Sequence, residues 1–278
     1  MDAISKRKLA TTAIILLCFG QRVALSCTAQ DLRSQSASAT LARQFPNPDL
    51  SFLLLDENGN VMAQRWDHPE REVPIGSLIK PFLAVAYGRT HTSFPKFHCE
   101  GKTTCWLPRG HGTLGIRQAI ALSCNSYFHQ PVADAEPGFA TPTLESFGLT
   151  AGGSEIDMVR QGGVASPLVL AKAYLELVNH SREEAEIPVL QGMALSAQKG
   201  TAKAAGAELR HLPALAKTGT APCTHQKKAP GDGFALIMAP ADHPRIVLLV
   251  RLHSRPGSMA AGVAGRMIAA VENSEQRN

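Results

Sequence analysis

The sequence predicts an α+β fold: a five-stranded antiparallel sheet covered by helices, with a helical subdomain inserted that faces the sheet. Apolar runs with strand signals lie near both ends of the 278-residue chain, and segments with helix signals fill its middle. The strands can share one sheet only if the two ends of the domain meet in space. The 44% hydrophobic content suffices for one sizeable core or two subdomains around a cleft, and no repeat is visible.

Residues 1–27 have the pattern of a secretory signal peptide or an N-terminal anchor. Three basic residues at positions 6–8 precede an apolar run over 9–20, shorter than the ~20 residues that a spanning helix needs. Small residues allow cleavage after Ser26, and a buried N-terminal helix is the alternative. The pattern predicts export to the periplasm or the outer face of the cytoplasmic membrane, with membrane attachment if the signal is retained.

A polar linker is expected over residues 28–49, and the catalytic domain over 50–272. The domain begins with two apolar runs, within residues 50–66, that flank Asn58-Gly59. This dipeptide between two apolar runs is a strong signal for a β-hairpin.

The middle of the chain contains three segments with helix signals. We expect helices over residues 77–87, 113–123 and 166–179, the last with a serine N-cap followed by proline. Residues 94–113 are expected to form an irregular loop rich in Gly, Pro, Cys and His. Residues 129–155 are rich in Pro and Gly and show no clear pattern.

The C-terminal part supplies the remaining strands. A short strand is expected within 212–221, and the runs 233–240 and 245–252 form a second hairpin. A helix of small residues over 257–273 closes the domain. The net charge of +5 is mild, and no run combines basic with aromatic residues. Nucleic acid is therefore not an expected partner.

The first chemical motif pairs Ser77 with Lys80. Residues three apart on a helix share one face, so the hydroxyl and the ammonium group would be neighbours. A serine hydroxyl needs a base to become a nucleophile, and an apolar setting lowers the pKa of a lysine toward the useful range. The plain alternative is an N-cap serine beside an exposed lysine.

Two further motifs offer hydroxyl, amide and ammonium groups. In Ser123-Cys124-Asn125, a second hydroxyl can relay a proton and an amide can hold a peptide carbonyl. In the sequence "KTGT", Lys217 offers a charge for a carboxylate, two threonines offer hydroxyls, and a glycine permits close approach of a substrate backbone. The plain alternatives are a helix C-cap and a strand-end turn.

The three motifs in this order resemble those of penicillin-recognising serine enzymes. The chain is similar to the transpeptidase domain of a class B penicillin-binding protein from about Leu50 to Ile268. The resemblance extends to the segments 97–128, 161–179 and 233–252. It implies the β-lactamase/transpeptidase-like fold, peptidoglycan stem peptides ending in D-Ala-D-Ala as substrates, β-lactams as covalent inhibitors, cell-wall synthesis proteins as partners, and no cofactor.

The resemblance also implies a role for each motif residue. Ser77 would attack the D-Ala-D-Ala carbonyl with Lys80 as general base. Ser123 would pass a proton to the departing D-Ala, supported electrostatically by Lys217. The substrate-binding residues would be one amide, two hydroxyls and one glycine, namely Asn125, Thr218, Thr220 and Gly219. Backbone N–H groups of Ser77 and Thr220 would form the oxyanion hole.

Three departures from the family pattern qualify this assignment. The usual N-terminal pedestal domain is missing, the segment between the second and third motifs is short, and Ser166 replaces a threonine of the family. The missing pedestal raises the alternative of a non-enzymatic β-lactam or muropeptide sensor, or a cell-wall scaffold, and the short segment puts part of the cleft wall for long glycan or stem-peptide substrates in doubt. A serine β-lactamase is a further alternative, for which Glu136 and Glu145, in the segment after Asn125, are the candidate hydrolytic acids.

The loop before the second motif contains two cysteines and a histidine at unusual spacing. Cys99 and Cys105 could form a disulfide in an exported protein, bind zinc together with His111, or stay as free thiols. The spacing is not that of a standard zinc finger, so a disulfide is the first expectation and no metal is assigned. Cys124 is expected to be a packing residue, because it lies between two predicted site residues and side chains adjacent on a helix point apart.

Overall fold

The computed structural model describes residues 30–102, 104–150, 152–223 and 231–275, so the predicted signal or anchor over 1–27 lies outside the described residues. Its centre is one five-stranded antiparallel sheet in the order β2-β1-β9-β8-β7. The strands are β1 (Leu50–Asp56), β2 (Val61–Arg65), β7 (Leu215–Ala221), β8 (Asp232–Ala239) and β9 (Ile246–Leu252). Leu50 pairs with Leu252, which confirms that the two ends of the domain meet within one sheet.

Both predicted hairpins are present. In the first, the Asp56 carboxylate accepts hydrogen bonds from the backbone N–H groups of Asn58 and Asn60, at 2.9 and 2.8 Å. This local side-chain-to-backbone bonding closes the turn that the Asn-Gly sequence predicted. In the second, β8 and β9 pair along their whole length.

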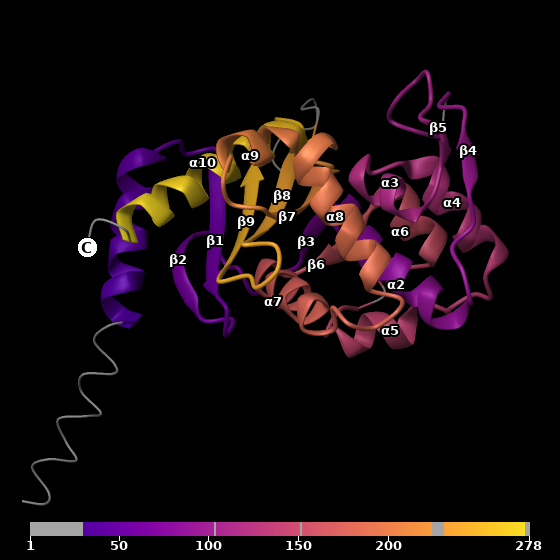
Figure 1. Ribbon diagram of the computed structural model, residues 1–278, viewed down its shortest axis with the longest axis horizontal. Helices are drawn as coiled ribbons and strands as arrows, with labels where there is room; N and C mark the ends of the chain where they lie inside the picture. Colours follow the sequence, from indigo (N-terminus) through magenta and orange to yellow (C-terminus); the bar gives the residue numbers. More distant parts are fainter. Residues whose placement is uncertain (1–29, 103, 151, 224–230, 276–278) are drawn as a thin grey trace, which may run out of the picture.

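One face of the sheet is covered by α10 (Gly257–Glu275), by α9 (Lys203–Glu208) and by a helix over residues 30–44 (Figure 1). That first helix corrects the expectation of a linker over 28–49. Ala37 and Leu41, one helical turn apart, are buried against the sheet, and Arg33 Nε lies 2.7 Å from a carboxylate oxygen of Glu275. Only a narrow apolar stripe faces the core, so the polar composition concealed the helix.

The other face carries the remaining helices, which include the inserted helical subdomain (Figure 1). The helices on this side are α2 (Lys80–Thr90), α3 (Ile116–Ala121), α4 (Asn125–Asp134), α5 (Thr141–Ser146), α6 (Glu155–Gln161), α7 (Pro167–Asn179) and α8 (Ile187–Lys199). The segment 129–155, for which no pattern was apparent, thus contributes to three helices. Two of them are short and end near glycines, which hides their periodicity.

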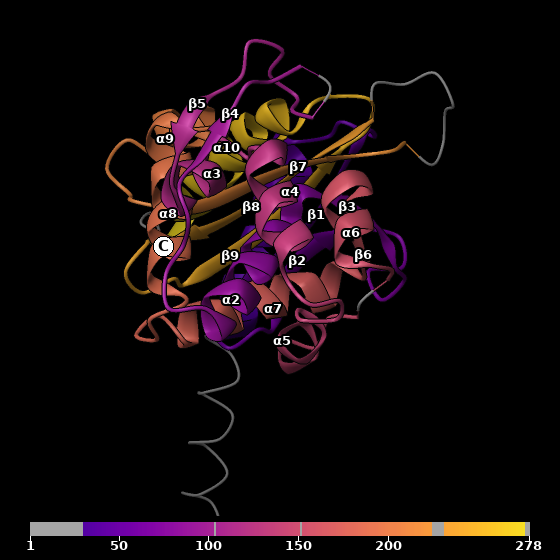
Figure 2. The same ribbon diagram turned by 90° about the vertical axis from the view of Figure 1, so that its right-hand side faces the viewer.

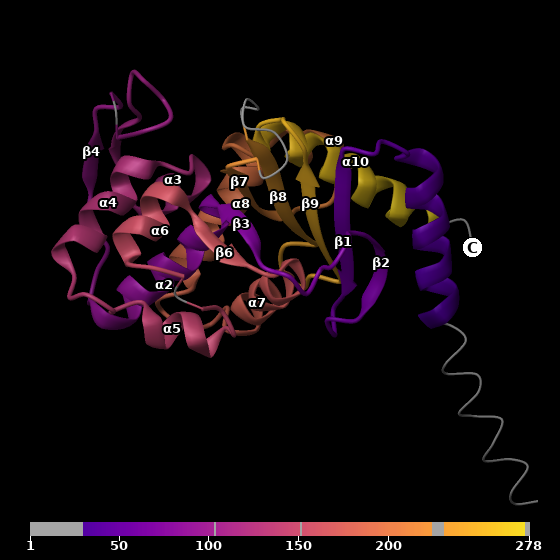
Figure 3. The ribbon, with the colours of Figure 1, turned by 180° about the vertical axis from the view of Figure 1, so that it is seen from behind.

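Two small antiparallel ribbons connect the parts. β3 (Val73–Gly76) pairs with β6 (Gly163–Ala165) between the large sheet and the helical subdomain (Figure 3). β4 (Phe97–Cys99) pairs with β5 (Gly112–Leu114) beside α3 and α4 (Figure 2), so the segment expected to be an irregular loop is in fact tied at both ends. None of the helices in the described ranges is long and apolar enough to cross a bilayer.

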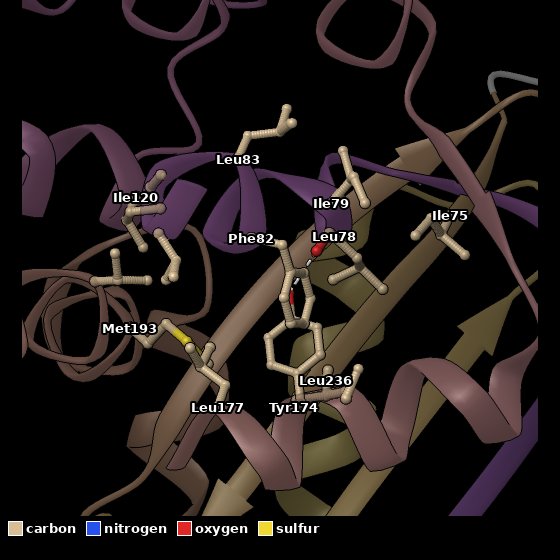
Figure 4. Packing of buried hydrophobic residues seen from close by; sticks show 14 of the residues in the cluster. Ile75, Leu78, Ile79, Phe82, Leu83, Ile120, Tyr174, Leu177, Met193 and Leu236 are labelled. Carbon is tan, nitrogen blue, oxygen red and sulfur yellow. Dashed lines mark hydrogen bonds between the residues drawn. The ribbon is translucent and has the colours of Figure 1, made fainter. Parts of the chain in front are cut away.

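The core between the sheet and α7 anchors the start of α2 (Figure 4). Leu78, Ile79 and Phe82 are all buried there, and the Phe82 ring packs edge-on against Tyr174 at 5.0 Å between centroids. The Tyr174 hydroxyl donates a 2.7 Å hydrogen bond to the carbonyl of Leu78. This bond fixes the short helical turn that contains Ser77.

Candidate active site

Ser77 begins a 3-10 turn, η1 (Ser77–Ile79), that continues directly into α2. The preceding Gly76 has φ +55°, and a Cβ there would lie 2.3 Å from the carbonyl oxygen of Thr220. Only glycine fits this close approach between η1 and β7. The first motif is therefore pressed against the strand that carries the third one.

Lys80 is 1% exposed and lies at the first position of α2. Its Nζ donates to the backbone carbonyl of Ser123 at 3.1 Å and to Oδ1 of Asn125 at 2.5 Å, and lies 5.4 Å from the centre of the Phe128 ring. Burial lowers the pKa of Lys80 from 10.5 to about 8, against the raising effect of the thiols of Cys124 and Cys105. The neutral amine that a general base requires is thus accessible near neutral pH.

Ser123 occupies the turn between α3 and α4, with a positive φ of 51°. Lys217 Nζ, fully buried in β7, donates to the Ser123 hydroxyl at 2.8 Å and to the carbonyl of Thr218 at 2.6 Å. Burial, followed by the nearby charge of Lys80, lowers the pKa of Lys217 well below its ordinary value. Two lysines from elements far apart in the sequence therefore converge on one serine.

The structure brings together Lys80, Ser123, Asn125 and Lys217, as the motif order predicted. Ser77 lies one turn before Lys80, but the contacts of the described residues include no hydrogen bond from its hydroxyl to either lysine.

The third motif follows the alternation of β7. Thr220 is exposed, and its hydroxyl accepts from the backbone N–H of Gly257 at 3.2 Å. Thr218 is buried and donates to the hydroxyl of Thr201 at 2.6 Å. A Cβ on Gly219 would lie 2.8 Å from the carbonyl oxygen of Ile75. The glycine therefore has a packing reason besides the substrate approach that the sequence suggested.

A pocket of about 660 Å³ opens beside the second motif. Asn125 and Ser126 form one wall, and His129 and Arg160 lie further along it, between α4 and α6. Burial, with the nearby charge of Arg160, lowers the pKa of His129. The pocket can accept an extended ligand whose polar groups meet an amide, a hydroxyl and a guanidinium group.

The predicted disulfide is not formed. Cys99 and Cys105 are both free thiols, and both approach His111 and Cys124. Cys124, expected to be a packing residue, is buried but directs its sulfur into this cluster. No pattern in the sequence indicated that Cys124 belongs to the cluster, because the cluster depends on how the loop over 94–113 folds back.

Two other residues that contact the motif residues were not predicted from the sequence. Phe128 lies under the Lys80 ammonium group, and Thr201 bonds to Thr218 and to the carbonyl of Ala121. A lysine–aromatic contact between separate helices has no sequence spacing that could reveal it. Thr201 lies just after α8, in a segment without a recognisable motif.

No protein-family model and no curated protein sequence matches the chain. Several solved structures are similar to it in fold over most of its length. Penicillin-binding protein PBP2 of Pseudomonas aeruginosa superposes with a TM-score of 0.69 at 16% identity, over 88% of this chain and 74% of that one. The transpeptidase domain of FtsI4 from Legionella pneumophila gives 0.65 at 21% identity, over 87% and 96%.

A third similar structure is penicillin-binding protein PBP2 of Helicobacter pylori, with a TM-score of 0.71 at 13% identity, over 84% of this chain and 62% of that one. The order of the sheet and the helices on its two faces are thus shared with several bacterial proteins of one kind. The chain has the fold of the transpeptidase domains of penicillin-binding proteins.

Proposed function

We propose that the chain is a penicillin-binding serine D,D-transpeptidase that acts on D-Ala-D-Ala stem peptides of peptidoglycan. The observation that carries this proposal is the convergence of two buried lysines on Ser123, one of which, Lys80, lies one helical turn after Ser77. Burying two cations side by side is costly, and such perturbed groups gather at functional sites. The fold shared with transpeptidase domains supports the same reading.

Acylation would begin at Ser77. Neutral Lys80 takes the hydroxyl proton as the oxygen attacks the carbonyl carbon of the penultimate D-Ala. The negative charge that develops on the carbonyl oxygen is stabilised by the backbone N–H groups of Ser77 and Thr220. A proton then passes through Ser123 to the amide nitrogen, the C–N bond breaks, and D-Ala leaves.

Deacylation would use the same groups in reverse. An acceptor amine attacks the ester and loses its proton to Lys80, and the Ser77 oxygen departs as a hydroxyl. The partners of Lys80 and Lys217 among the described residues are carbonyl, amide and hydroxyl groups, with no carboxylate. No carboxylate in the described part of the chain is therefore placed to act as the general base for water, as one would in a β-lactamase. This favours transfer of the acyl group to an amine.

The remaining residues would bind the substrate. Thr218 and Thr220 receive the terminal carboxylate, with Lys217 as electrostatic support, and Asn125 holds the peptide amide. To do so, Asn125 exchanges its bond with Lys80 for one with substrate. Location outside the cytoplasmic membrane and contact with cell-wall synthesis proteins are part of the proposal. The Helicobacter pylori PBP2 was solved in complex with MreC, and the Pseudomonas aeruginosa PBP2 in complex with WCK 5153.

The test is a covalent adduct with a fluorescent penicillin, located by peptide mass spectrometry. We expect one adduct per chain at Ser77, absent from Ser77→Ala and present in the matched variant Ser181→Ala, an exposed serine after α7. The adduct should last many minutes, without steady nitrocefin turnover. An adduct that survives in Ser77→Ala, or no adduct at all, would refute the proposal.

The fate of a D-Ala-D-Ala peptide separates the related activities. D-Ala release that depends on an added amine indicates transpeptidation, and release with water alone indicates carboxypeptidation. A stable penicillin adduct without any D-Ala release would favour the sensor. Steady hydrolysis of nitrocefin would favour the β-lactamase.

A further inference from the structure

A cluster of four metal-ligating side chains lies beside the second motif, outside the chemistry proposed above. Cys99 ends β4, Cys105 and His111 lie in the loop before β5, and Cys124 lies between Ser123 and Asn125. One ligand atom from each side chain lies within 4.8 Å of all the others. The cluster thus joins three separate parts of the chain at one point.

Three distances within the cluster match those of a tetrahedron around a small cation. A zinc ion with bonds of about 2.3 Å to sulfur and about 2.0 Å to nitrogen sets its ligands about 3.8 Å apart for two sulfurs and about 3.5 Å for sulfur and nitrogen. Cys105 Sγ lies 3.8 Å from Cys124 Sγ, and His111 Nδ1 lies 3.4 Å from Cys105 Sγ and 3.6 Å from Cys99 Sγ.

The surroundings are built for a closed site. Cys99 and Cys124 are 1% and 0% exposed, and Cys105 is 8% exposed. A Cβ on Gly110 would lie 2.1 Å from the carbonyl oxygen of Cys99, so the loop can fold back on itself only with glycine there.

A disulfide explains this arrangement less well. Its sulfur atoms are about 2.05 Å apart, whereas those of Cys105 and Cys124 lie 3.8 Å apart, and one disulfide would use only two of the four side chains that converge here. The thiols of Cys99 and Cys105 instead share the imidazole Nδ1, and Cys124 contacts the sulfur of Cys105, while Nε2 of His111 has no hydrogen-bond partner in the described part of the chain. All polar contacts of the ring therefore pass through the atom that faces the sulfurs.

We propose that Cys99, Cys105, Cys124 and His111 bind a structural zinc ion in tetrahedral coordination. Three thiolates and one imidazole are ligands that zinc prefers, and four protein ligands in a closed site leave no position for a reacting water. This zinc site does not depend on the proposed function. It would fasten the loop over 99–111 to the turn that contains Ser123.

Other contacts also join this loop to the segment that contains the second motif. Trp106 Nε1 donates to the carbonyl of Leu122 at 3.1 Å, and the hydroxyls of Thr104 and Ser126 lie 2.8 Å apart. The loop thus contacts the chain on both sides of Cys124, at Leu122 and at Ser126. The zinc ion would be the strongest member of this set of contacts.

The experiment measures zinc in the full chain, purified under reducing conditions and incubated with zinc before excess metal is removed. We expect one zinc per chain by elemental mass spectrometry, and three thiols that become reactive only after chelation. Cys105→Ser and His111→Gln should each weaken zinc affinity by more than the about 10–100-fold that loss of a second-shell partner costs. His243→Gln is the matched control, because His243 is exposed and lies outside both groups of metal-ligating side chains, so this change should leave zinc binding unchanged.

A second measurement requires no variant that could misfold. Cobalt(II) added to the zinc-free wild-type protein should give the intense visible bands of a tetrahedral site and a thiolate charge-transfer band. Absence of both zinc and the cobalt spectrum in reduced protein overturns the proposal. So does zinc that remains undiminished in His111→Gln, and so does a Cys99–Cys105 disulfide in protein that binds no zinc once reduced.

Discussion

Replacing Lys80 with methionine tests the central claim about this site, because it removes the charge while keeping a similar side-chain volume. Lys80 is almost completely buried, and its pKa falls from 10.5 to about 8. This difference means that the folded protein disfavours the charged form by about 3 kcal/mol relative to the unfolded chain. Methionine removes this cost but leaves the buried carbonyl of Ser123 without a donor, which costs about 1–3 kcal/mol, whereas the part-buried Asn125 amide lines the pocket and is open to water.

The two effects nearly cancel, so we expect the free energy of unfolding of Lys80→Met at pH 7 to lie within about 2 kcal/mol of the wild type, on the stabilising side. Penicillin acylation should fall by about 10²–10⁴, the usual contribution of a general base. Lys172→Met, at an exposed position of α7, is the control and should change neither quantity appreciably. Urea unfolding and the rate of adduct formation measure the two effects separately.

The pH dependence of stability provides an internal check. Between about pH 8 and pH 10.5 the unfolded chain keeps the Lys80 proton while the folded protein loses it. The unfolded state therefore binds more protons, and the wild type should gain stability with rising pH relative to Lys80→Met. Wild-type acylation in Lys80→Met, or a loss of several kcal/mol of stability, would refute the reasoning.

Three further results are expected. The rate of penicillin acylation should rise with pH through about 8, because only neutral Lys80 accepts the Ser77 proton; a flat profile from about pH 6 to pH 9.5 would contradict this. Gly76→Ala should lower the free energy of unfolding by at least about 2 kcal/mol, since its Cβ would meet the Thr220 carbonyl. Gly138→Ala, with a positive φ but open space, should cost only about 1 kcal/mol in the same urea titration. Chelating zinc from the reduced protein should slow acylation at least about tenfold while far-UV circular dichroism stays unchanged, and an unchanged rate would show that the metal does not position Ser123.

The sequence predicted the sheet well because its signals are local. The Asn58-Gly59 turn and the alternating runs of the second hairpin each specify a piece of structure within a few residues. The Ser77–Lys80 spacing similarly places two groups on one helical turn. The pairing of β1 with β9 followed from the requirement that the two hairpins share a sheet.

Features that depend on folding at a distance could not be predicted in this way. The helix over 30–44 is recognisable only from what Ala37 and Leu41 pack against. Cys124 looked like a packing residue because its partners, Cys99 and Cys105, reach it only after the intervening loop doubles back. The contact of Lys80 with Phe128 likewise exists only once α2 and α4 lie side by side.

The turn at Ser123 shows how these distant contacts produce the site. A residue with a side chain at φ 51° costs about 1–2 kcal/mol, and such a conformation persists only where the surroundings determine it from several directions. Here Lys80 holds the backbone carbonyl of Ser123 from α2, and Lys217 holds its hydroxyl from β7. The neighbouring Cys124 is held by the loop cluster. The hydroxyl at the centre of the site is therefore fixed by the elements it would have to serve in catalysis, so that little reorganisation is needed when a substrate enters between the sheet and the helical subdomain.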